Sequence, residues 1–242
     1  MKKQKKSELN TLKEFKKVFE QAAYFGGYES TFNDFLTMCI YAFARNPLTG
    51  LSYYEDEYME LMGLYQERGV IEHFPHLLAI LVAYMEEHKD STEGNDLLGT
   101  FYEQEVSHGR NGQYFTPFPI CHLMASITDD DKEVPRSVLD PSCGSGRMLM
   151  AYSKRIPLQS GFYGIDLDPS CVKMTAINLF LNGRSGEVMR ADALTPDDFK
   201  FAYRVSHQPL GIFKIEKRED SRLWHMNQKI PNRTKKRQLR LF

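Results

Sequence analysis

The sequence lacks the features that mark membrane and secreted proteins. Its longest apolar run, residues 77–85, is much shorter than the roughly 20 residues that span a bilayer, so we interpret it as a buried helix. The lysines that follow Met1 lead into a polar segment rather than an apolar signal region, which argues against secretion. We therefore expect a cytoplasmic protein without a membrane partner.

Cysteine and net charge are also scarce. The 4 cysteines (Cys39, Cys121, Cys143 and Cys171) are far apart and form no CxxC pair, which indicates reduced thiols and predicts no metal site. The formal net charge of -1 argues against a protein that coats nucleic acid by bulk electrostatics. This charge does not exclude a protein with one basic face. A hydrophobic content of 42% is ordinary for a globular chain and excludes wholesale disorder.

The first part of the chain, residues 1–108, has the pattern of a helical domain. Apolar residues recur at spacings of three and four, and the stretches end at Gly, Asn or Pro. The expected helices cover residues 7–24, 31–45, 53–68, 74–87 and 97–107.

After a turn-rich junction at residues 109–112, short β-type runs alternate with helical ones. Strands are expected at 137–140, 162–166 and 186–191, with helices at 148–154 and 169–182, and this alternation is typical of a parallel α/β sheet. We place this domain at residues 109–215. Residues 216–242 form a polar, basic tail, either solvated or an arm that contacts phosphates.

The most informative segment is a strand that runs into a glycine turn and then a helix, Asp140-Pro-Ser-Cys-Gly-Ser-Gly146. The two glycines let the backbone approach a ligand, and Asp166 at the end of the next strand suits the hydroxyls of a ribose. A dinucleotide-binding turn would have glycine where Leu149 stands. A P-loop would have Gly-Lys-Ser/Thr after the turn, and this chain does not.

This segment resembles motif I of the S-adenosylmethionine-dependent N6-adenine DNA methyltransferases, and the similarity is greatest to the methylation subunit of type I restriction–modification systems. Three further segments resemble motifs X, II and III of that family, in matching order and spacing. They are Gly112-Gln-Tyr-Phe-Thr-Pro117, Tyr163-Gly-Ile-Asp-Leu-Asp-Pro169 and Arg190-Ala-Asp-Ala-Leu194. The resemblance covers about residues 95–200 and implies an α/β fold, an N-terminal helical bundle followed by an incomplete Rossmann-like methyltransferase sheet.

The resemblance also implies S-adenosyl-L-methionine as cofactor and a role for each matching position. Asp140 would pair with the cofactor's ammonium, and Thr116, beside the helix opened by Pro117, would help to hold its carboxylate. Asp166 would take the ribose hydroxyls, and Asp192 the adenine amino group. Asp168 is expected only to cap the following helix. The implied cofactor-binding residues are Tyr114, Phe115, Thr116, Pro117, Asp140, Pro141, Cys143, Gly144, Gly146, Asp166, Leu167, Asp192 and Ala193.

The family's methyl-transfer tetrapeptide, Asn/Asp-Pro-Pro-Tyr/Phe, occurs nowhere in the chain. Its place is expected after the run 201–205, where the sequence instead reads Ser206-His-Gln-Pro-Leu210. Pro209 alone matches. His207 and Gln208 could accept a hydrogen bond, but Leu210 cannot stack on a base as an aromatic ring does.

The sequence therefore predicts a cofactor-binding protein of the N6-adenine DNA methylase type, with DNA as the partner that the resemblance implies. About 30 residues after the transfer position are too few for further strands and a DNA-reading region, so we expect the chain alone to be a weak or inactive enzyme. The alternative is a non-catalytic cofactor-binding or partner subunit whose helical domain docks onto another protein. A methyltransferase acting on RNA or protein is disfavoured only by the resemblance.

Overall fold

The computed structural model describes residues 2–46, 48–89, 91, 95–107, 114–128, 137–195, 197–207, 209–228 and 240–241. The chain divides into two compact units, residues 1–114 and 115–242, and each is described here by itself. The expected boundary at 108/109 falls on residues that lie outside the described ones. Within the described residues, no helix combines the length and the apolar character that a bilayer crossing requires.

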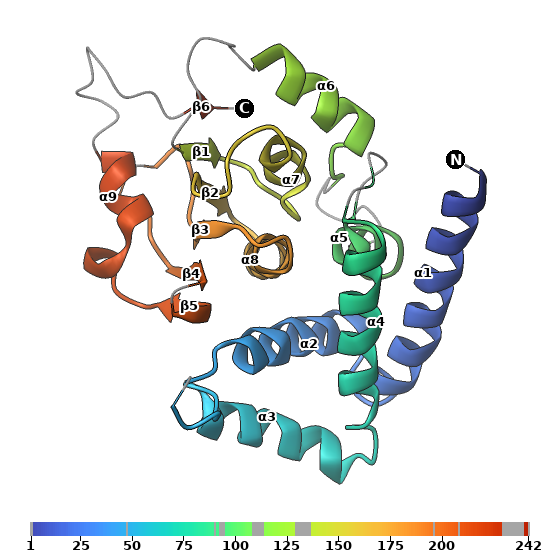
Figure 1. Ribbon diagram of the computed structural model, residues 1–242. Helices are drawn as coiled ribbons and strands as arrows, with labels where there is room; N and C mark the ends of the chain where they lie inside the picture. Colours follow the sequence, from blue (N-terminus) through green and yellow to red (C-terminus); the bar gives the residue numbers. More distant parts are fainter. Residues whose placement is uncertain are drawn as a thin grey trace. The chain divides into compact units, whose positions relative to one another are not determined.

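The first unit is a helical bundle, as the apolar periodicity predicts (Figure 1). Helix α1 packs on α4, and α2 packs on α3. Phe15 and Phe19 of α1 both contact the ring of Phe101 edge-on, with ring centroids 5.0 and 4.8 Å apart, and all three side chains are fully buried. The helices are α1 (Lys2–Ala22), α2 (Tyr28–Phe43), α3 (Glu55–Glu67), α4 (His73–Glu87) and α5 (Leu97–Phe101), which continues as the π-helical turn η1 (Tyr102–Ser107).

The second unit is a mixed α/β domain. Its elements are α6 (Phe118–Thr128), β1 (Ser137–Asp140), α7 (Arg147–Ser153), β2 (Gly161–Asp166), α8 (Pro169–Leu181), β3 (Ser185–Arg190), β4 (Phe201–His207), β5 (Leu210–Ile215), the 3-10 turn η3 (Arg218–Asp220), α9 (Arg222–Gln228) and β6 (Arg240–Leu241). They form a six-stranded sheet in the order β5-β4-β3-β2-β1-β6.

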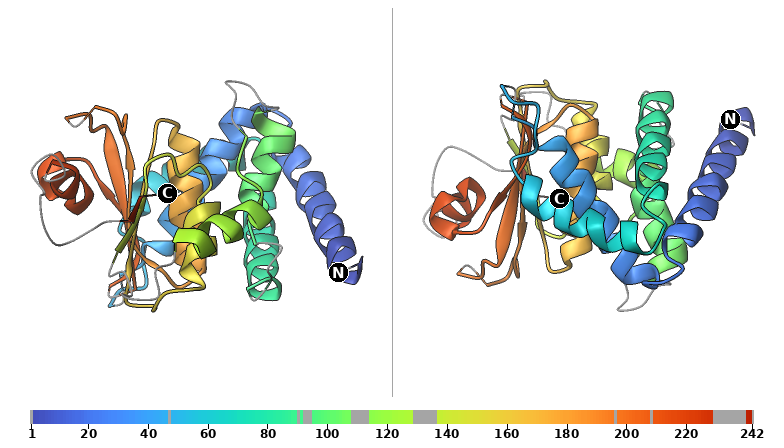
Figure 2. Two further views of the ribbon diagram at one scale, coloured as in Figure 1. Left: turned by 90° about the horizontal axis from the view of Figure 1, so that it is seen from above. Right: turned by 90° about the horizontal axis from the view of Figure 1, so that it is seen from below.

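Strands β6, β1, β2 and β3 are mutually parallel, so the carboxyl ends of all four lie at one edge of the sheet. Helices α7 and α8 cover one face of this sheet, and α9 lies on the other (Figures 1 and 2). On the α9 side, Leu223 is fully buried in a cluster that includes Leu139, Tyr163 and Ile165. The two apolar faces explain why the three predicted strands read as short, nearly continuous hydrophobic runs.

The segment 201–207 departs from the parallel pattern. Strand β4 runs antiparallel to β3, with Phe201 opposite Arg190 and Val205 opposite Gly186, and β5 returns antiparallel to β4. The sheet is therefore mixed rather than purely parallel. Because β4 is reversed, its carboxyl end lies at the edge of the sheet away from the carboxyl end of β3.

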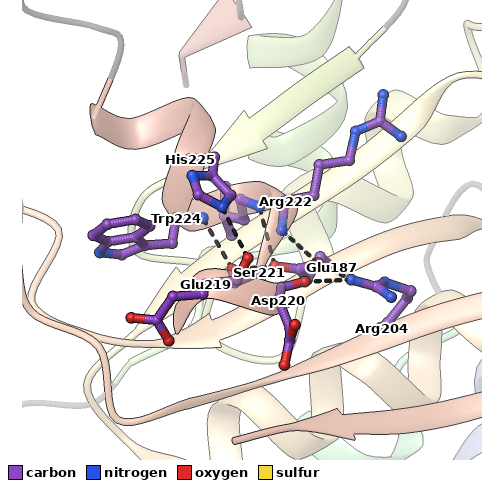
Figure 3. Close-up of polar contacts among 9 residues, drawn as sticks. Glu187, Arg204, Glu219, Asp220, Ser221, Arg222, Trp224 and His225 are labelled. Carbon is purple, nitrogen blue, oxygen red and sulfur yellow. Dashed lines mark hydrogen bonds and ion pairs between the residues drawn. The ribbon is translucent and has the colours of Figure 1, made fainter. Parts of the chain in front are cut away.

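Within residues 216–242, the segment 221–223 packs on the sheet. Glu187 of β3 is 1% exposed and accepts hydrogen bonds from the hydroxyl of Ser221, from Arg222 N at 3.2 Å and from Leu223 N at 3.1 Å (Figure 3). Arg204 of β4 lies 3.6 Å from the same carboxylate. These four groups, here called the Glu187 anchor, fix the first turn of α9 against β3. The basic run 233–237 lies outside the described residues.

Candidate functional site

The carboxyl edge of the sheet brings together the two acidic residues that the sequence singled out. Asp140 ends β1 and Asp166 ends β2, and the parallel register sets Asp140 opposite Gly164. Paired residues in a parallel ladder share a face, and Asp166 follows Gly164 by two positions, so both carboxylates point to the face that carries α7 and α8. Ligands of open α/β sheets bind outside the carboxyl ends of the strands, where Asp140 and Asp166 lie.

The turn from β1 to α7 is fastened to the end of β2 by backbone hydrogen bonds. Cys143 N donates to Ile165 O at 3.0 Å, and Gly144 N donates to Asp166 Oδ2 at 2.9 Å. Ser142 N donates to Asp140 Oδ1 at 3.0 Å, which holds the start of the turn. Pro141, half-buried, lies within this turn. The carboxylate of Asp166 is thus part of the same structure as the glycine turn.

Gly144 and Gly146 are required by backbone conformation as well as by space. Their φ angles are +54° and +89°, in the left-handed region that residues with a Cβ rarely adopt. A Cβ on Gly144 would lie 2.8 Å from the ring of Phe115, and one on Gly146 would lie 3.2 Å from Thr175. Alanine at either position would therefore displace a neighbour and strain the turn.

Two buried polar side chains of α8 hold the carbonyls of the turn. Thr175 Oγ1 donates to Gly144 O at 2.8 Å, and Asn178 Nδ2 donates to Ser145 O at 2.9 Å. Both residues are fully buried. Neither was predicted from the sequence, although polar residues three apart in an otherwise apolar helix were an available signal. They give the turn a fixed shape before any ligand arrives.

Asp140 is 7% exposed, and burial raises the pKa of its carboxyl from 3.8 to about 6. The hydrogen bond from Ser142 works against this rise, and the charge of Asp166 adds to it. Among the described residues, none donates a hydrogen bond to the second carboxylate oxygen, Oδ2. A buried, incompletely solvated carboxylate of this kind attracts a cationic ligand group.

Asp166 keeps acceptor capacity for a ligand. Burial raises the pKa of its carboxyl, while the N–H groups of Asp168 and Gly144 lower it. Asp168 N donates to Oδ1 at 2.9 Å and Gly144 N donates to Oδ2, and a backbone hydrogen bond from Leu167 also lowers the pKa of this carboxyl. A carboxylate offers about four acceptor positions, so these backbone groups leave acceptor capacity for a ligand hydroxyl.

Cys143 contributes its backbone to the turn and its side chain to the core. The thiol is buried against Gly164, where a Cβ would lie 2.9 Å from the sulfur. Burial, followed by the charges of Asp166 and Asp140, raises the pKa of the Cys143 thiol well above its usual value. The side chain therefore stays a neutral packing group.

The segment that precedes α6 lies on the glycine turn. The ring of Phe115 packs on Gly144, and the guanidinium of Arg147 lies 5.4 Å from the centre of that ring. Thr116 and Pro117 are exposed, and Pro117 O accepts from Cys121 N at 3.1 Å, so the helix opens at Phe118, after Pro117. Tyr114 belongs to the first unit and is 77% exposed; Gly112 and Gln113 lie outside the described residues.

The remaining predicted positions follow β2 and β3. Asp168 caps α8 by accepting from Ser170 N at 2.7 Å, as expected. Leu167 is 65% exposed, which leaves its side chain accessible to a ligand. Asp192 accepts from Leu194 N at 2.9 Å and from the hydroxyl of Thr195 at 3.1 Å, which shapes its own turn. Ala193 is half-buried against the cluster around Leu223.

The residues expected at the methyl-transfer position lie elsewhere. His207 ends β4 and Leu210 begins β5, so these residues and Pro209 belong to the β4–β5 connection. That connection lies near the start of β3, because Val205 pairs with Gly186, whereas Asp166 pairs with Arg190 at its end. The placement of the transfer position at 206–210 is therefore wrong. Gln208 lies outside the described residues.

Strand β1 has β2 on one side and β6 on the other, and both run parallel to it. Val138 pairs with Arg240 and Leu139 with Leu241, so the carboxyl end of β6 lies next to Asp140. No group of three or more His, Cys, Asp and Glu residues in the described part of the chain is arranged to hold a metal ion. The site therefore consists of two carboxylates, a rigid glycine turn and the segment at Phe115.

Comparisons with known proteins show the family of the chain. The family model described as N-6 DNA Methylase matches residues 93–238, more than half of the chain. The type I restriction enzyme MjaIX methylase subunit of Methanocaldococcus jannaschii is 27% identical over 155 residues, which are 56% of this chain and 27% of that protein. The MjaVII methylase subunit of the same organism is also 27% identical over 155 residues, 59% of this chain and 26% of that protein.

Among solved structures, a modification subunit from Vibrio vulnificus YJ016 shares 18% identity and covers 65% of this chain and 35% of its own, with a TM-score of 0.39. The matched region spans about a quarter of the length of the two curated relatives.

Proposed function

Because the chain belongs to the N-6 DNA methylase family, we propose that its second unit binds S-adenosylmethionine on the glycine turn, as the cofactor half of an adenine-specific DNA methylase. The observation that carries this proposal is the pair Asp140 and Asp166, which flank a turn whose Gly144 and Gly146 have positive φ. The relatives named above are methylase subunits of type I restriction enzymes, which supports a proposed role in restriction–modification.

The side chains present fit this cofactor. Its ammonium group needs a carboxylate, and Asp140 offers the oxygen Oδ2, to which none of the described residues donates a hydrogen bond. Its ribose hydroxyls need a carboxylate acceptor, and Asp166 keeps acceptor capacity beyond the backbone groups that it already binds. When bound, the cofactor supplies an electrophilic methyl group.

Further contacts follow from the neighbouring segments. The exposed side chain of Leu167 would cover the adenine ring, and Asp192 with Ala193 would form the far wall beside it. Thr116 and the start of α6 would meet the carboxylate, where free N–H groups favour an anion. These roles rest on the resemblance and on the position of each residue at the same edge of the sheet.

We also propose that the chain alone does not transfer the methyl group. The sequence contains no Asn/Asp-Pro-Pro-Tyr/Phe, and the β4–β5 connection lies away from Asp140 and Asp166. An adenine amine is a weak nucleophile that needs positioned acceptors, and these would have to stand beside Asp140, beyond the end of β6. N6-methyladenine in DNA incubated with this chain and the cofactor would contradict this part of the proposal.

The helical first unit supports a role in assembly. Tyr24, Phe25, Leu48 and Leu51 are each more than half exposed, so these apolar side chains are available for contact with another protein. We propose that this unit docks onto another subunit of a methylase complex that acts on DNA. Copurification of a partner, with methylation detected only in the complex, is the expected result.

The cofactor proposal is tested by calorimetric titration of the whole chain with S-adenosylmethionine. The unvaried chain should bind it, and Asp140→Ala and Asp166→Ala should each weaken binding at least tenfold, equivalent to about 1.4 kcal/mol. Asp197→Ala, which removes an exposed carboxylate outside the turn, is the matched control and should bind normally. Equal affinity in all four proteins would overturn the assignment of the two carboxylates.

A further inference from the structure

Arg147 is the residue after the glycine turn, and no motif assigned it a role. Its side chain is 9% exposed, and its guanidinium lies 5.4 Å from the ring centre of Phe115 and 5.9 Å from that of Phe118. Arg147 Nη1 also donates to the backbone carbonyl of Phe115 at 3.4 Å. One guanidinium thus contacts both rings and the main chain of the segment 115–118.

The same ring is in contact with the turn itself. A Cβ on Gly144 would lie 2.8 Å from Phe115 Cδ1 and 3.0 Å from Cε1, so the ring rests directly on the bare glycine backbone. Phe115 therefore contacts both Gly144 of the turn and Arg147, the first residue of α7. Any movement of segment 115–118 relative to the turn must break the contact with Arg147.

From this arrangement, which rests on the proposed function, we propose that Arg147 is a positioning residue. It fixes segment 115–118 over the glycine turn and so sets the affinity for the amino-acid part of S-adenosylmethionine rather than for its nucleoside. Thr116 lies within the fixed segment, whereas Asp166, which would hold the ribose, is fastened by the backbone N–H groups of Gly144 and Asp168. A planar guanidinium stacks on aromatic rings in a way that lysine does not reproduce.

The test compares two ligands on the whole chain. S-adenosylmethionine carries the amino-acid part, and 5′-methylthioadenosine lacks it. Arg147→Met should lower the affinity for S-adenosylmethionine about tenfold, while it changes the affinity for 5′-methylthioadenosine less than about twofold. The affinity of Arg147→Lys for S-adenosylmethionine should lie between those of the unvaried protein and Arg147→Met. Arg155→Met, the same change at an exposed arginine beyond α7, should leave both affinities unaltered.

A double-mutant cycle tests whether Arg147 acts through Phe115. In a Phe115→Leu background, Arg147→Met should have less than about a twofold further effect, because the ring that it positions is gone. Independent, multiplicative effects of the two changes would overturn the inference. Equal weakening of both ligands by Arg147→Met would also overturn it, since that is the signature of general damage to the turn.

Amide hydrogen exchange separates this inference from the proposed function. In the protein without ligand, exchange at Phe115 and Thr116 should quicken in Arg147→Met and stay unchanged in Arg155→Met. Unaltered exchange would overturn the positioning role, whatever the chain binds. If exchange quickens but the unvaried chain binds no S-adenosylmethionine, the positioning of the segment stands, and the proposed function and the claim about affinity fail.

Discussion

Asp140 and Glu187 are acidic residues buried in the same sheet, but their surroundings differ. Glu187, on the α9 side, accepts from Ser221, Arg222 N and Leu223 N and lies 3.6 Å from Arg204. Asp140, at the carboxyl edge, has Ser142 N and the repelling charge of Asp166. A buried carboxylate whose oxygens all accept hydrogen bonds from the protein stabilises the fold. A buried carboxylate with fewer hydrogen-bond donors around it is suited to bind a ligand.

The largest expected effect is on the Glu187 anchor. Glu187→Ala leaves the N–H groups of Arg222 and Leu223 and the buried hydroxyl of Ser221 without their acceptor, so we expect the free energy of unfolding of the second unit to fall by about 3 kcal/mol. Trp224, the only tryptophan of the chain, lies in α9, and its fluorescence during urea unfolding reports on this unit. Glu219→Ala, at an exposed glutamate paired with Arg218, should change the free energy of unfolding by less than about 0.5 kcal/mol. A similar loss in both variants would contradict the anchor.

Substitution of Asp140 should have a smaller effect on the free energy of unfolding, and in the stabilising direction. Because its pKa is raised from 3.8 to about 6 in the folded protein, the folded state binds a proton more tightly than the unfolded state does. The stability that this group contributes is complete below about pH 4 and is lost as the pH rises through about 6.

Asp140→Asn removes this dependence. At pH 8 we expect the variant to exceed the unvaried protein in free energy of unfolding by about 1–2 kcal/mol, less than the full electrostatic cost because the amide brings its own polar groups. At pH 4 the difference should be close to zero. Urea unfolding at a series of pH values measures it, and a difference that is constant across this range would contradict the account of Asp140.

The smallest effect concerns the support of the turn from α8. Thr175→Val keeps the shape of the side chain but removes the hydrogen bond to Gly144 O, so we expect a loss of about 1 kcal/mol in the free energy of unfolding. Thr128→Val removes a hydroxyl that bonds within its own helix, α6, and should cost less than about 0.5 kcal/mol. If the two variants are equally stable, Thr175 does not support the turn.

The sequence predicted those parts of the fold that short-range patterns encode. The helices of the first unit and strands β1, β2 and β3 lie where apolar periodicity and glycine turns placed them. For most of these elements, the observed and expected ends differ by no more than two residues. The direction of β4 could not be predicted, because a strand and its reverse have the same alternation of side chains. The short connection to β5, with Pro209 and Gly211, was an unrecognised hairpin signal.

Short-range patterns also decide which residues of the site could be predicted. Asp140, Asp166 and the glycines were found because a strand, a turn and an acidic residue follow one another in sequence. Arg147, Thr175 and the Glu187 anchor were missed because each depends on a partner far along the chain: Arg147 on Phe115, Thr175 on Gly144, and Glu187 on Ser221. A single sequence holds no direct record of such pairs.

The most direct test of the central claim is a calorimetric titration of the unvaried chain at pH 7 with S-adenosylmethionine and, separately, with nicotinamide adenine dinucleotide. Both ligands offer a ribose to Asp166, but only the first offers an ammonium to Asp140. The account predicts saturable binding of S-adenosylmethionine at one site and no saturable heat with the dinucleotide. Absence of S-adenosylmethionine binding at high micromolar concentration, or preference for the dinucleotide, would contradict it.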